Sequence, residues 1–150
     1  HCPFDCNGKK DMFGKDDYKK IPNGAPGIET LLMLMHTEGV VNGRISLERM
    51  VDVLSTGTAR MFGLKDKGEI VMGKDADIVV FDPDQKFTIT QEKLHMNVDY
   101  TPFEGMEMTG MPYAVYSRGK RVAEWNGEQV AFVGEIGRGR FLKREPFEGF

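Results

Sequence analysis

The feature that most constrains the fold of this chain is a change in the spacing of its apolar residues near Lys67. Before Lys67, apolar side chains recur at helical spacing, whereas after it they follow the shorter period of strands. Helices and strands are therefore segregated along the chain. This order is typical of an α+β protein or of two structural units, and not of one alternating α/β unit.

Three helices are predicted before this change of spacing. The first begins near Ile28 and ends at Gly39 as a C-cap, and the second begins at Ser46, a favourable N-cap residue. A short third helix is predicted from Thr58, as its N-cap, to Gly63. The apolar stripe of the first helix comprises Leu31, Leu32, Leu34 and Met35. The buried face of the second helix is predicted to comprise Leu47, Met50, Val51 and Leu54.

Strands are predicted at residues 69–72, 77–82, 86–90, 113–117, 120–124 and 129–133. Residues 78–81 are continuously apolar, so this strand is expected to be covered on both faces and to end at Pro83. Gly73-Lys74-Asp75, Arg118-Gly119 and Asn126-Gly127 mark turns. Residues 137–150 mix Arg, Gly and Phe and are expected to form an extended tail.

The first 27 residues show no sustained periodicity and predict a long loop, either functional or separated from its structural context. The chain opens with His1 and not with Met, which we interpret as a break within a longer protein. Its two cysteines, Cys2 and Cys6, are expected to be reduced thiols of an intracellular protein, although a disulfide in a tight loop is the alternative.

The charge of the chain gives no reason to expect nucleic acid as a partner. The formal net charge is -3 with a pI near 5.7, whereas nucleic-acid binding needs a clustered basic face. The longest apolar run spans residues 31–35, far short of the roughly 20 residues of a membrane helix. We therefore expect no membrane contact, and without a visible signal peptide we expect a cytoplasmic protein.

The residues alone supply no complete active site. The three histidines His1, His36 and His95 lack the spacing of metal ligands, and His36 and His95 are expected at the core edge or the surface. The acidic residues Asp16, Asp17, Asp75, Asp77 and Asp82 are interpreted as solvated or turn-forming. The best candidate is the loop at residues 21–27, where prolines fix the backbone and glycines permit close approach by a ligand. The alternative is a simple helix-entry loop.

Several segments together resemble a known family. They are H-C-P-F (1–4), G-K-D-D (14–17), I-P-N-G (21–24), G-I-E (27–29), S-T-G-T-A-R-M-F (55–62), K-G-E-I (67–70), G-K-D-A-D-I-V-V-F-D-P (73–83), S-R-G (117–119) and the tail at 137–147. In this order they resemble the C-terminal third of dihydropyrimidinases and D-hydantoinases, members of the amidohydrolase superfamily.

The resemblance implies an α/β fold in which this chain is the C-terminal part of a larger protein. The family combines a (β/α)8 metal-dependent barrel with a β-sandwich built from both chain ends. Residues 1–66 would supply a loop and the terminal helices of the barrel, and residues 67–136 the C-terminal part of the sandwich. Residues 137–150 would form a tail that contacts a neighbouring subunit of a homotetramer.

The resemblance also implies a zinc-dependent hydrolysis of the ring amide of dihydropyrimidines or 5-substituted hydantoins. In the family, two zinc ions held by four histidines, a carboxylated lysine and an aspartate activate the attacking hydroxide. The aspartate would stand immediately before His1, so no catalytic residue or metal ligand is expected in this chain, which alone should be inactive and bind no zinc. Only the backbone of Asn23 carries over, as a group that hydrogen-bonds the small cyclic amide substrate.

A second hypothesis is a non-catalytic structural and oligomerisation module. The collapsin response mediator proteins resemble this chain in much of the same pattern without the metal chemistry. They typically carry an acidic residue where this chain has Asn23. Asn23 therefore favours the enzymatic branch.

Overall fold

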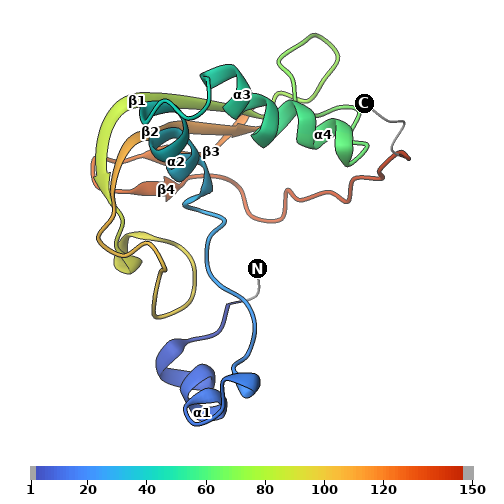
Figure 1. Cartoon of the computed structure of the whole chain (residues 1–150). Helices are drawn as coiled ribbons and strands as arrows, with labels where there is room; N and C mark the ends of the chain where they lie inside the picture. The colour runs from blue at the N-terminus through green and yellow to red at the C-terminus, as the bar shows by residue number, and fades with distance from the viewer. Residues whose placement is uncertain (1–2, 147–150) are drawn as a thin grey trace.

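The computed structural model describes residues 3–146 and centres on a four-stranded antiparallel sheet in the order β1-β2-β3-β4. Helices lie beside β1 and β2, and a separate helical segment at the N-terminal end of the chain lies away from the sheet (Figure 1). The helical elements are η1 (Cys6–Lys10), α1 (Asp11–Gly14), η2 (Tyr18–Lys20), α2 (Leu31–Leu34), η3 (Met35–Val41), α3 (Leu47–Val51), η4 (Asp52–Thr56), α4 (Gly57–Met61) and η5 (Gln91–Lys93). The strands are β1 (Ile78–Thr88), β2 (Glu107–Ser117), β3 (Lys120–Trp125) and β4 (Val130–Phe132).

The opening stretch of the chain is not the long loop that its irregular sequence predicts. Two helical turns, η1 and α1, follow one another with a kink at Gly8, and η2 adds a further turn. Asp17 caps η2 by accepting a hydrogen bond from the backbone N–H of Lys19. Apolar periodicity cannot reveal these turns, because they are short and contacts with distant residues hold them in place.

The helix formed by α2 and η3 continues past Gly39, so the predicted C-cap at Gly39 is wrong. The glycine that ends this helix with a positive φ is Gly43, at +68°. Gly39 instead lets Ile45 approach, because a Cβ there would lie 3.0 Å from the Ile45 side chain. Met33 is the buried residue of α2, and Leu31 of the predicted stripe is exposed.

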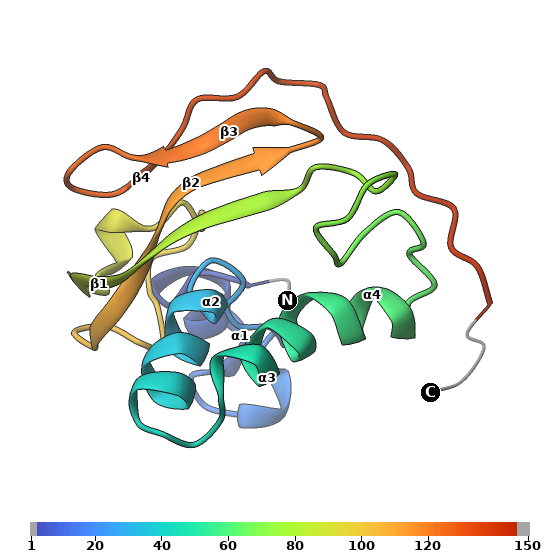
Figure 2. The same cartoon turned by 90° about the horizontal axis from the view of Figure 1, so that it is seen from above.

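The helices α3, η4 and α4 form one continuous rod, seen from above in Figure 2. Ser46 caps it as predicted, since its Oγ accepts from the backbone N–H of Arg49 at 3.2 Å. Thr58 is not an N-cap; it lies inside the rod and donates to the Val53 carbonyl at 2.6 Å. Gly63, with φ of +64°, follows the end of the rod as predicted.

The predicted buried face of this rod is only partly correct. Met50 is buried and Leu54 is half-buried, but Leu47 and Val51 are exposed. The spacing identifies an apolar face correctly, yet only part of that face meets another element of this chain.

The predicted strand at residues 69–72 does not form. A strand needs the backbone hydrogen bonds of a neighbour, and within residues 3–146 no other strand pairs with this segment. Ile70 is 80% exposed. Gly73, with φ of +92°, provides the predicted turn before β1.

Strand β1 runs through Pro83 and does not end there. Asp82 accepts hydrogen bonds from the backbone N–H groups of Asp84 and Gln85, and the register with β2 shifts between Asp82 and Lys86. Proline is tolerated in such an irregularity on an edge strand. Val79 and Val80 are each about half exposed, so the residues that the structure describes do not provide the expected cover on both faces.

The turns after β2 match the sequence prediction closely. Arg118 and Gly119 both have positive φ, at 47° and 74°, and join β2 to β3 in the predicted hairpin. Asn126 and Gly127 turn the chain into β4, where Asn126 accepts from the backbone N–H groups of the next two residues beyond Gly127.

The core lies between α2 and the face of β1 and β2. Its buried members are Met33, Phe87, Ile89, Met108 and Met111. Leu34, Leu94, Phe103, Met106, Trp125 and Val130 pack against them.

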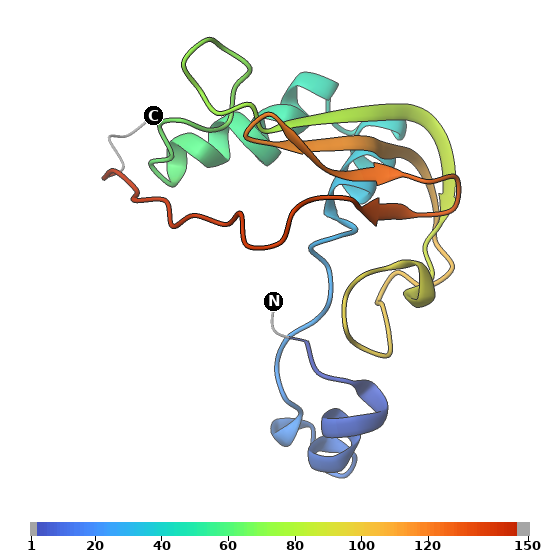
Figure 3. The ribbon, with the colours of Figure 1, turned by 180° about the vertical axis from the view of Figure 1, so that it is seen from behind.

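The tail from residue 137 to residue 146 is extended, as predicted, and runs from the sheet back to α4 (Figure 3). Arg138 donates to the Ser117 carbonyl at 3.1 Å, and the Glu145 backbone N–H donates to the Gly63 carbonyl at 3.0 Å. None of the helices within residues 3–146 is long and apolar enough to cross a membrane.

Candidate functional site

The loop at residues 21–27 is well fixed at both of its ends. Pro26 is fully buried, and the Thr30 hydroxyl donates to the Gly27 carbonyl at 3.2 Å. Between these anchors Asn23 is exposed and Gly24 takes a φ of +112°, which glycine adopts without steric cost. The loop therefore holds Asn23 as an exposed residue between two fixed ends.

Helix α1 packs directly against the start of this loop. Gly14 is buried, and a Cβ there would overlap the Ile21 side chain and lie 3.0 Å from Ile21 Cα. Glycine at this position permits the close approach. This packing fixes the position of Ile21, the first residue of the loop.

Lys10 and Tyr100 meet at the carbonyl of Gly24. The Lys10 ammonium donates to this oxygen at 3.0 Å and to the Tyr100 hydroxyl oxygen at 2.6 Å. It also lies 4.7 Å from the centroid of the Tyr100 ring. Sequence reasoning did not identify either residue, because no spacing pattern links side chains 90 positions apart.

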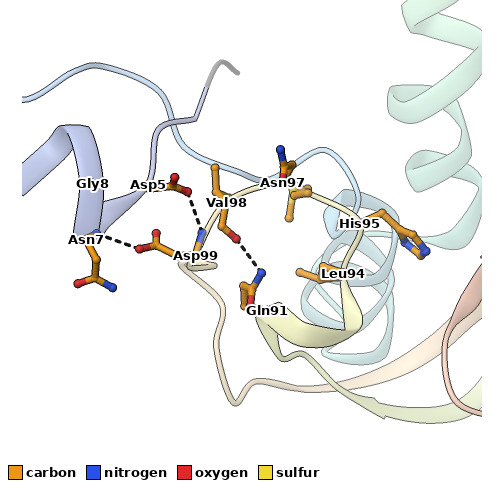
Figure 4. Close-up of a pocket in the computed structure, with 10 residues that line it drawn as sticks. Asp5, Asn7, Gly8, Gln91, Leu94, His95, Asn97, Val98 and Asp99 are labelled. Carbon is orange, nitrogen blue, oxygen red and sulfur yellow. Dashed lines mark hydrogen bonds between the residues drawn. The ribbon is translucent and has the colours of Figure 1, made fainter.

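The neighbour of Tyr100, Asp99, caps the N-terminus of η1. Its carboxylate accepts from the backbone N–H groups of Cys6 at 2.7 Å and Asn7 at 2.9 Å, while Asp5 accepts from the backbone N–H of Asp99 (Figure 4). The hydrogen bonds from Asn7 and Cys6 lower the pKa of Asp99. The carboxylate thus stays ionised where the dipole of the helical turn favours negative charge.

A polar cavity of about 620 Å³ opens beside this junction (Figure 4). It lies between η1 and the connection that follows β1. Its lining residues are Asp5, Asn7, Gly8, Gln91, Leu94, His95, Met96, Asn97, Val98 and Asp99. Asn23 is not among them, so the cavity and the predicted substrate-binding backbone are separate features.

The histidines in the described part of the chain have structural partners. His36 is buried, its Nδ1 lies 2.7 Å from the Thr109 carbonyl, and its ring packs edge-on against Phe81. His95 is exposed and pairs with Glu29 through its ring and its backbone N–H, both at 2.7 Å. Both histidines were predicted at the core edge or the surface; His36 lies in the core and His95 at the surface. His1 lies outside the described residues.

The described residues do not fit a zinc centre. Among residues 3–146, no group of three or more His, Cys, Asp or Glu side chains is placed to hold a metal ion. Cys6 is half-buried, and its predicted relation to Cys2 concerns a residue outside the described range.

The acidic residues around the turn into β1 form an ion-pair network. Lys67 pairs with Asp75 at 2.7 Å and with Asp77. Asp77 also accepts from the backbone N–H of Arg118 at 2.8 Å. Desolvation raises the pKa of Asp77, but the hydrogen bonds from Lys67 and Arg118 outweigh it and the pKa is lowered. The predicted turn-forming role of these carboxylates fits this arrangement.

Comparison of the sequence with known proteins gives consistent matches. Residues 6–123 match the Amidohydrolase family. The D-hydantoinase of Geobacillus stearothermophilus is 46% identical over 147 residues, covering 97% of this chain and 30% of that protein. The D-hydantoinase of Ralstonia pickettii is 41% identical over 149 residues, covering 99% and 31%.

Solved structures show the same relationship in three dimensions. A D-hydantoinase from a Bacillus species matches with a TM-score of 0.92 and 50% identity, over 99% of this chain and 32% of that chain. The dihydropyrimidinase of Brevibacillus agri matches with a TM-score of 0.90 and 49% identity, over 98% and 31%. The chain spans about 30% of the length of the curated relatives that it matches.

Proposed function

The chain belongs to the amidohydrolase family, and from that membership we propose that it is the C-terminal portion of a cyclic amidohydrolase. The complete protein would hydrolyse the ring amide of dihydropyrimidines or 5-substituted hydantoins. The observation that carries this proposal is the similarity to D-hydantoinases over nearly the whole chain. The relatives' names do not favour the alternative of a non-catalytic module.

In this proposal the chain contributes to substrate binding and not to the chemical step. The backbone of Asn23, an exposed residue, would hydrogen-bond the cyclic amide, and the fixed ends of its loop support such a role. A backbone group held in a rigid frame binds without first losing conformational freedom. Asn23 therefore serves as an orienting group in the proposal.

The metal centre of the complete protein is also a proposal. Two zinc ions, bridged by a carboxylated lysine, would supply an activated hydroxide. As the resemblance implies, their ligands would lie in an earlier part of the complete protein. We propose the domain assignment that the resemblance implies. Residues 1–66 would belong to the barrel, residues 67–136 to the sandwich and residues 137–150 to the tail. The complete protein would be a cytoplasmic homotetramer.

The test begins with the complete natural gene product. Its intact mass is expected to be about three times the 16.9 kDa of this chain, as the 30% coverage of a relative implies, with about two zinc ions per subunit. Dihydrouracil or 5-phenylhydantoin should be opened to the corresponding N-carbamoyl amino acid as water adds across the ring C–N bond. Chelation should abolish this activity, and added zinc should restore it.

The 150-residue chain alone is the matched control. It is expected to show no ring opening and no stoichiometric zinc. Hydrolysis by the isolated chain would contradict the assignment of the chemistry to other residues. A metal-loaded complete protein that opens neither substrate would contradict the proposed function.

A further inference from the structure

The carbonyl of Gly24 is held by groups from two distant parts of the chain. Lys10 comes from η1, 14 residues away, and Tyr100 from the connection between β1 and β2. The Tyr100 hydroxyl lies 3.5 Å from the Gly24 oxygen and accepts from Lys10 at 2.6 Å. All three contacts are partly buried, where a charge-assisted hydrogen bond is stronger than in open solvent.

This contact holds the loop at its glycine, where the backbone has the widest choice of conformations. Gly24 has no side chain, and its φ of +112° is one of several values that glycine adopts readily. Its carbonyl can keep one direction only if a donor holds it there. Gly24 directly follows Asn23 in the chain, so holding the Gly24 carbonyl restricts how far the backbone at Asn23 can move.

The two donors are themselves fixed to each other. Asp99, next to Tyr100, accepts from the N–H groups of Cys6 and Asn7 at the start of the helical turn that carries Lys10. Asp5 returns a contact by accepting from the Asp99 backbone N–H at 3.2 Å. The connection after β1 is thus tied to η1 at adjacent positions, and together they clamp the loop.

We propose that Lys10 and Tyr100 are positioning residues that hold the backbone at Asn23 in the orientation that binds the cyclic amide. This inference rests on the proposed function. Neither side chain needs to touch the substrate. Their effect passes through the Gly24 carbonyl.

The test uses the complete protein with Lys10→Met, Lys10→Arg and Tyr100→Phe. Lys10→Met keeps the aliphatic stem and removes the charge, and Tyr100→Phe keeps the ring and removes the hydroxyl. Loss of one charge-assisted hydrogen bond should raise KM for 5-phenylhydantoin about tenfold while kcat changes less than about threefold. Lys10→Arg retains a donor and should recover part of the lost affinity. Backbone amides of residues 21–27 should exchange hydrogen faster in Lys10→Met.

The matched control is Lys9→Met, at the adjacent position of the same helical turn. Lys9 lies over the Phe4 ring, 5.4 Å from its centroid, and is not a donor to the loop. The Lys9→Met variant should leave both KM and the hydrogen exchange of residues 21–27 unchanged. Melting curves of all variants establish that each one is folded, and Tyr100→Phe provides the test if Lys10→Met does not fold.

The outcomes separate this inference from the proposed function. If wild type opens the ring and the Lys10 and Tyr100 variants keep its KM and its exchange, the positioning role is overturned and the proposed function stands. If wild type opens neither substrate, the proposed function fails. Hydrogen exchange then still decides whether Lys10 and Tyr100 hold the loop.

Discussion

Gly110 lies in β2 where that strand passes the helix carrying His36. Its φ is +99°, and a Cβ there would overlap His36 Nδ1 and lie 2.7 Å from Phe81 Cζ. The substitution Gly110→Ala therefore combines an unfavourable backbone with crowding of the buried ring pair. We expect it to lower the free energy of unfolding by about 2–4 kcal/mol, measured by chemical denaturation of the complete protein.

The control for this prediction is Gly119→Ala in the hairpin turn. Gly119 also has a positive φ, at 74°, but a Cβ there would meet nothing within 4 Å. This variant should carry only the backbone penalty of about 1 kcal/mol. If both variants lowered the free energy of unfolding equally, crowding against His36 would not contribute to the destabilisation.

The network of Lys67, Asp75 and Asp77 predicts a dependence of stability on pH. The folded pKa of Asp77 is lowered, so its contribution is complete above the unfolded value of about 4 and is lost as pH falls through the folded pKa. Desolvation lowers the pKa of Lys67, but its hydrogen bonds to Asp75 and Asp77 prevail and raise it. The Lys67 contribution is therefore complete below about pH 10 and is lost as pH rises through its folded pKa.

We expect Asp77→Asn to lower the free energy of unfolding by about 1 kcal/mol at pH 7, a small effect because the pair is partly solvated. The difference from wild type should shrink as the pH is lowered below about 4. Denaturation curves at several pH values measure it. Asp84→Asn, an exposed change on β1, is the control and should stay within about 0.5 kcal/mol of wild type. A pH-independent difference for Asp77→Asn would contradict the ion-pair assignment.

At the scale of the elements, Ser46 determines where the long helical rod begins. Ser46→Ala removes the acceptor for the Arg49 backbone N–H and should cost about 1 kcal/mol. Ser46→Asn keeps a capping oxygen and should be nearly neutral. Hydrogen exchange of the amides at residues 47–49 measures the effect directly. Equal protection in Ser46→Ala and wild type would mean that packing and not the cap fixes the start of the rod.

Several elements determined by short-range chemistry were predictable from the sequence, although the predicted caps at Gly39 and Thr58 were wrong. Ser46 and Gly63 mark the ends of the rod because capping and positive φ depend on single residues. The pair Arg118-Gly119 marks the hairpin for the same reason. The fold class, part of an amidohydrolase α/β fold, is confirmed by the solved relatives.

Elements determined by distant partners were not predictable in this way. Residues 69–72 have strand-like composition but no strand beside them among the described residues. The turns of η1 depend on Asp99, a carboxylate 92 and 93 positions away from the N–H groups it accepts. The loop around Asn23 was a candidate from its prolines and glycines. Lys10 and Tyr100 became visible only in three dimensions.

At the scale of the whole molecule, the proposed homotetramer assigns a role to the tail. Phe141 is 95% exposed, although the tail on either side of it is hydrogen-bonded to the rest of this chain through Arg138 and Glu145. In the proposed tetramer this ring packs on a neighbouring subunit, and Phe141→Asp should therefore lower the oligomeric mass measured by light scattering. Phe141→Leu keeps an apolar contact and is the control. An unchanged mass for Phe141→Asp would remove the tail from the subunit contact.

Strand β1 gives a sharper test of how this chain relates to the complete protein. β1 is an edge strand of the sheet. Its consecutive residues Val79 and Val80 point to opposite faces, and each is about half exposed. An uncovered edge strand of this kind promotes association of the chain with itself. In a protein of the relatives' length, additional chain is available to cover it.

The substitution Val80→Lys should therefore act in opposite directions in the two contexts. In the isolated chain it places a charge on an open edge and should reduce self-association, measured by light scattering and by binding of a hydrophobic dye. In the complete protein it would bury that charge and should cost about 2–3 kcal/mol of unfolding free energy. Asp84→Lys, an exposed site on the same strand, is the control for added charge. If Val80→Lys leaves the complete protein as stable as wild type, Val80 faces solvent there too, and the remaining chain does not cover this face of the sheet.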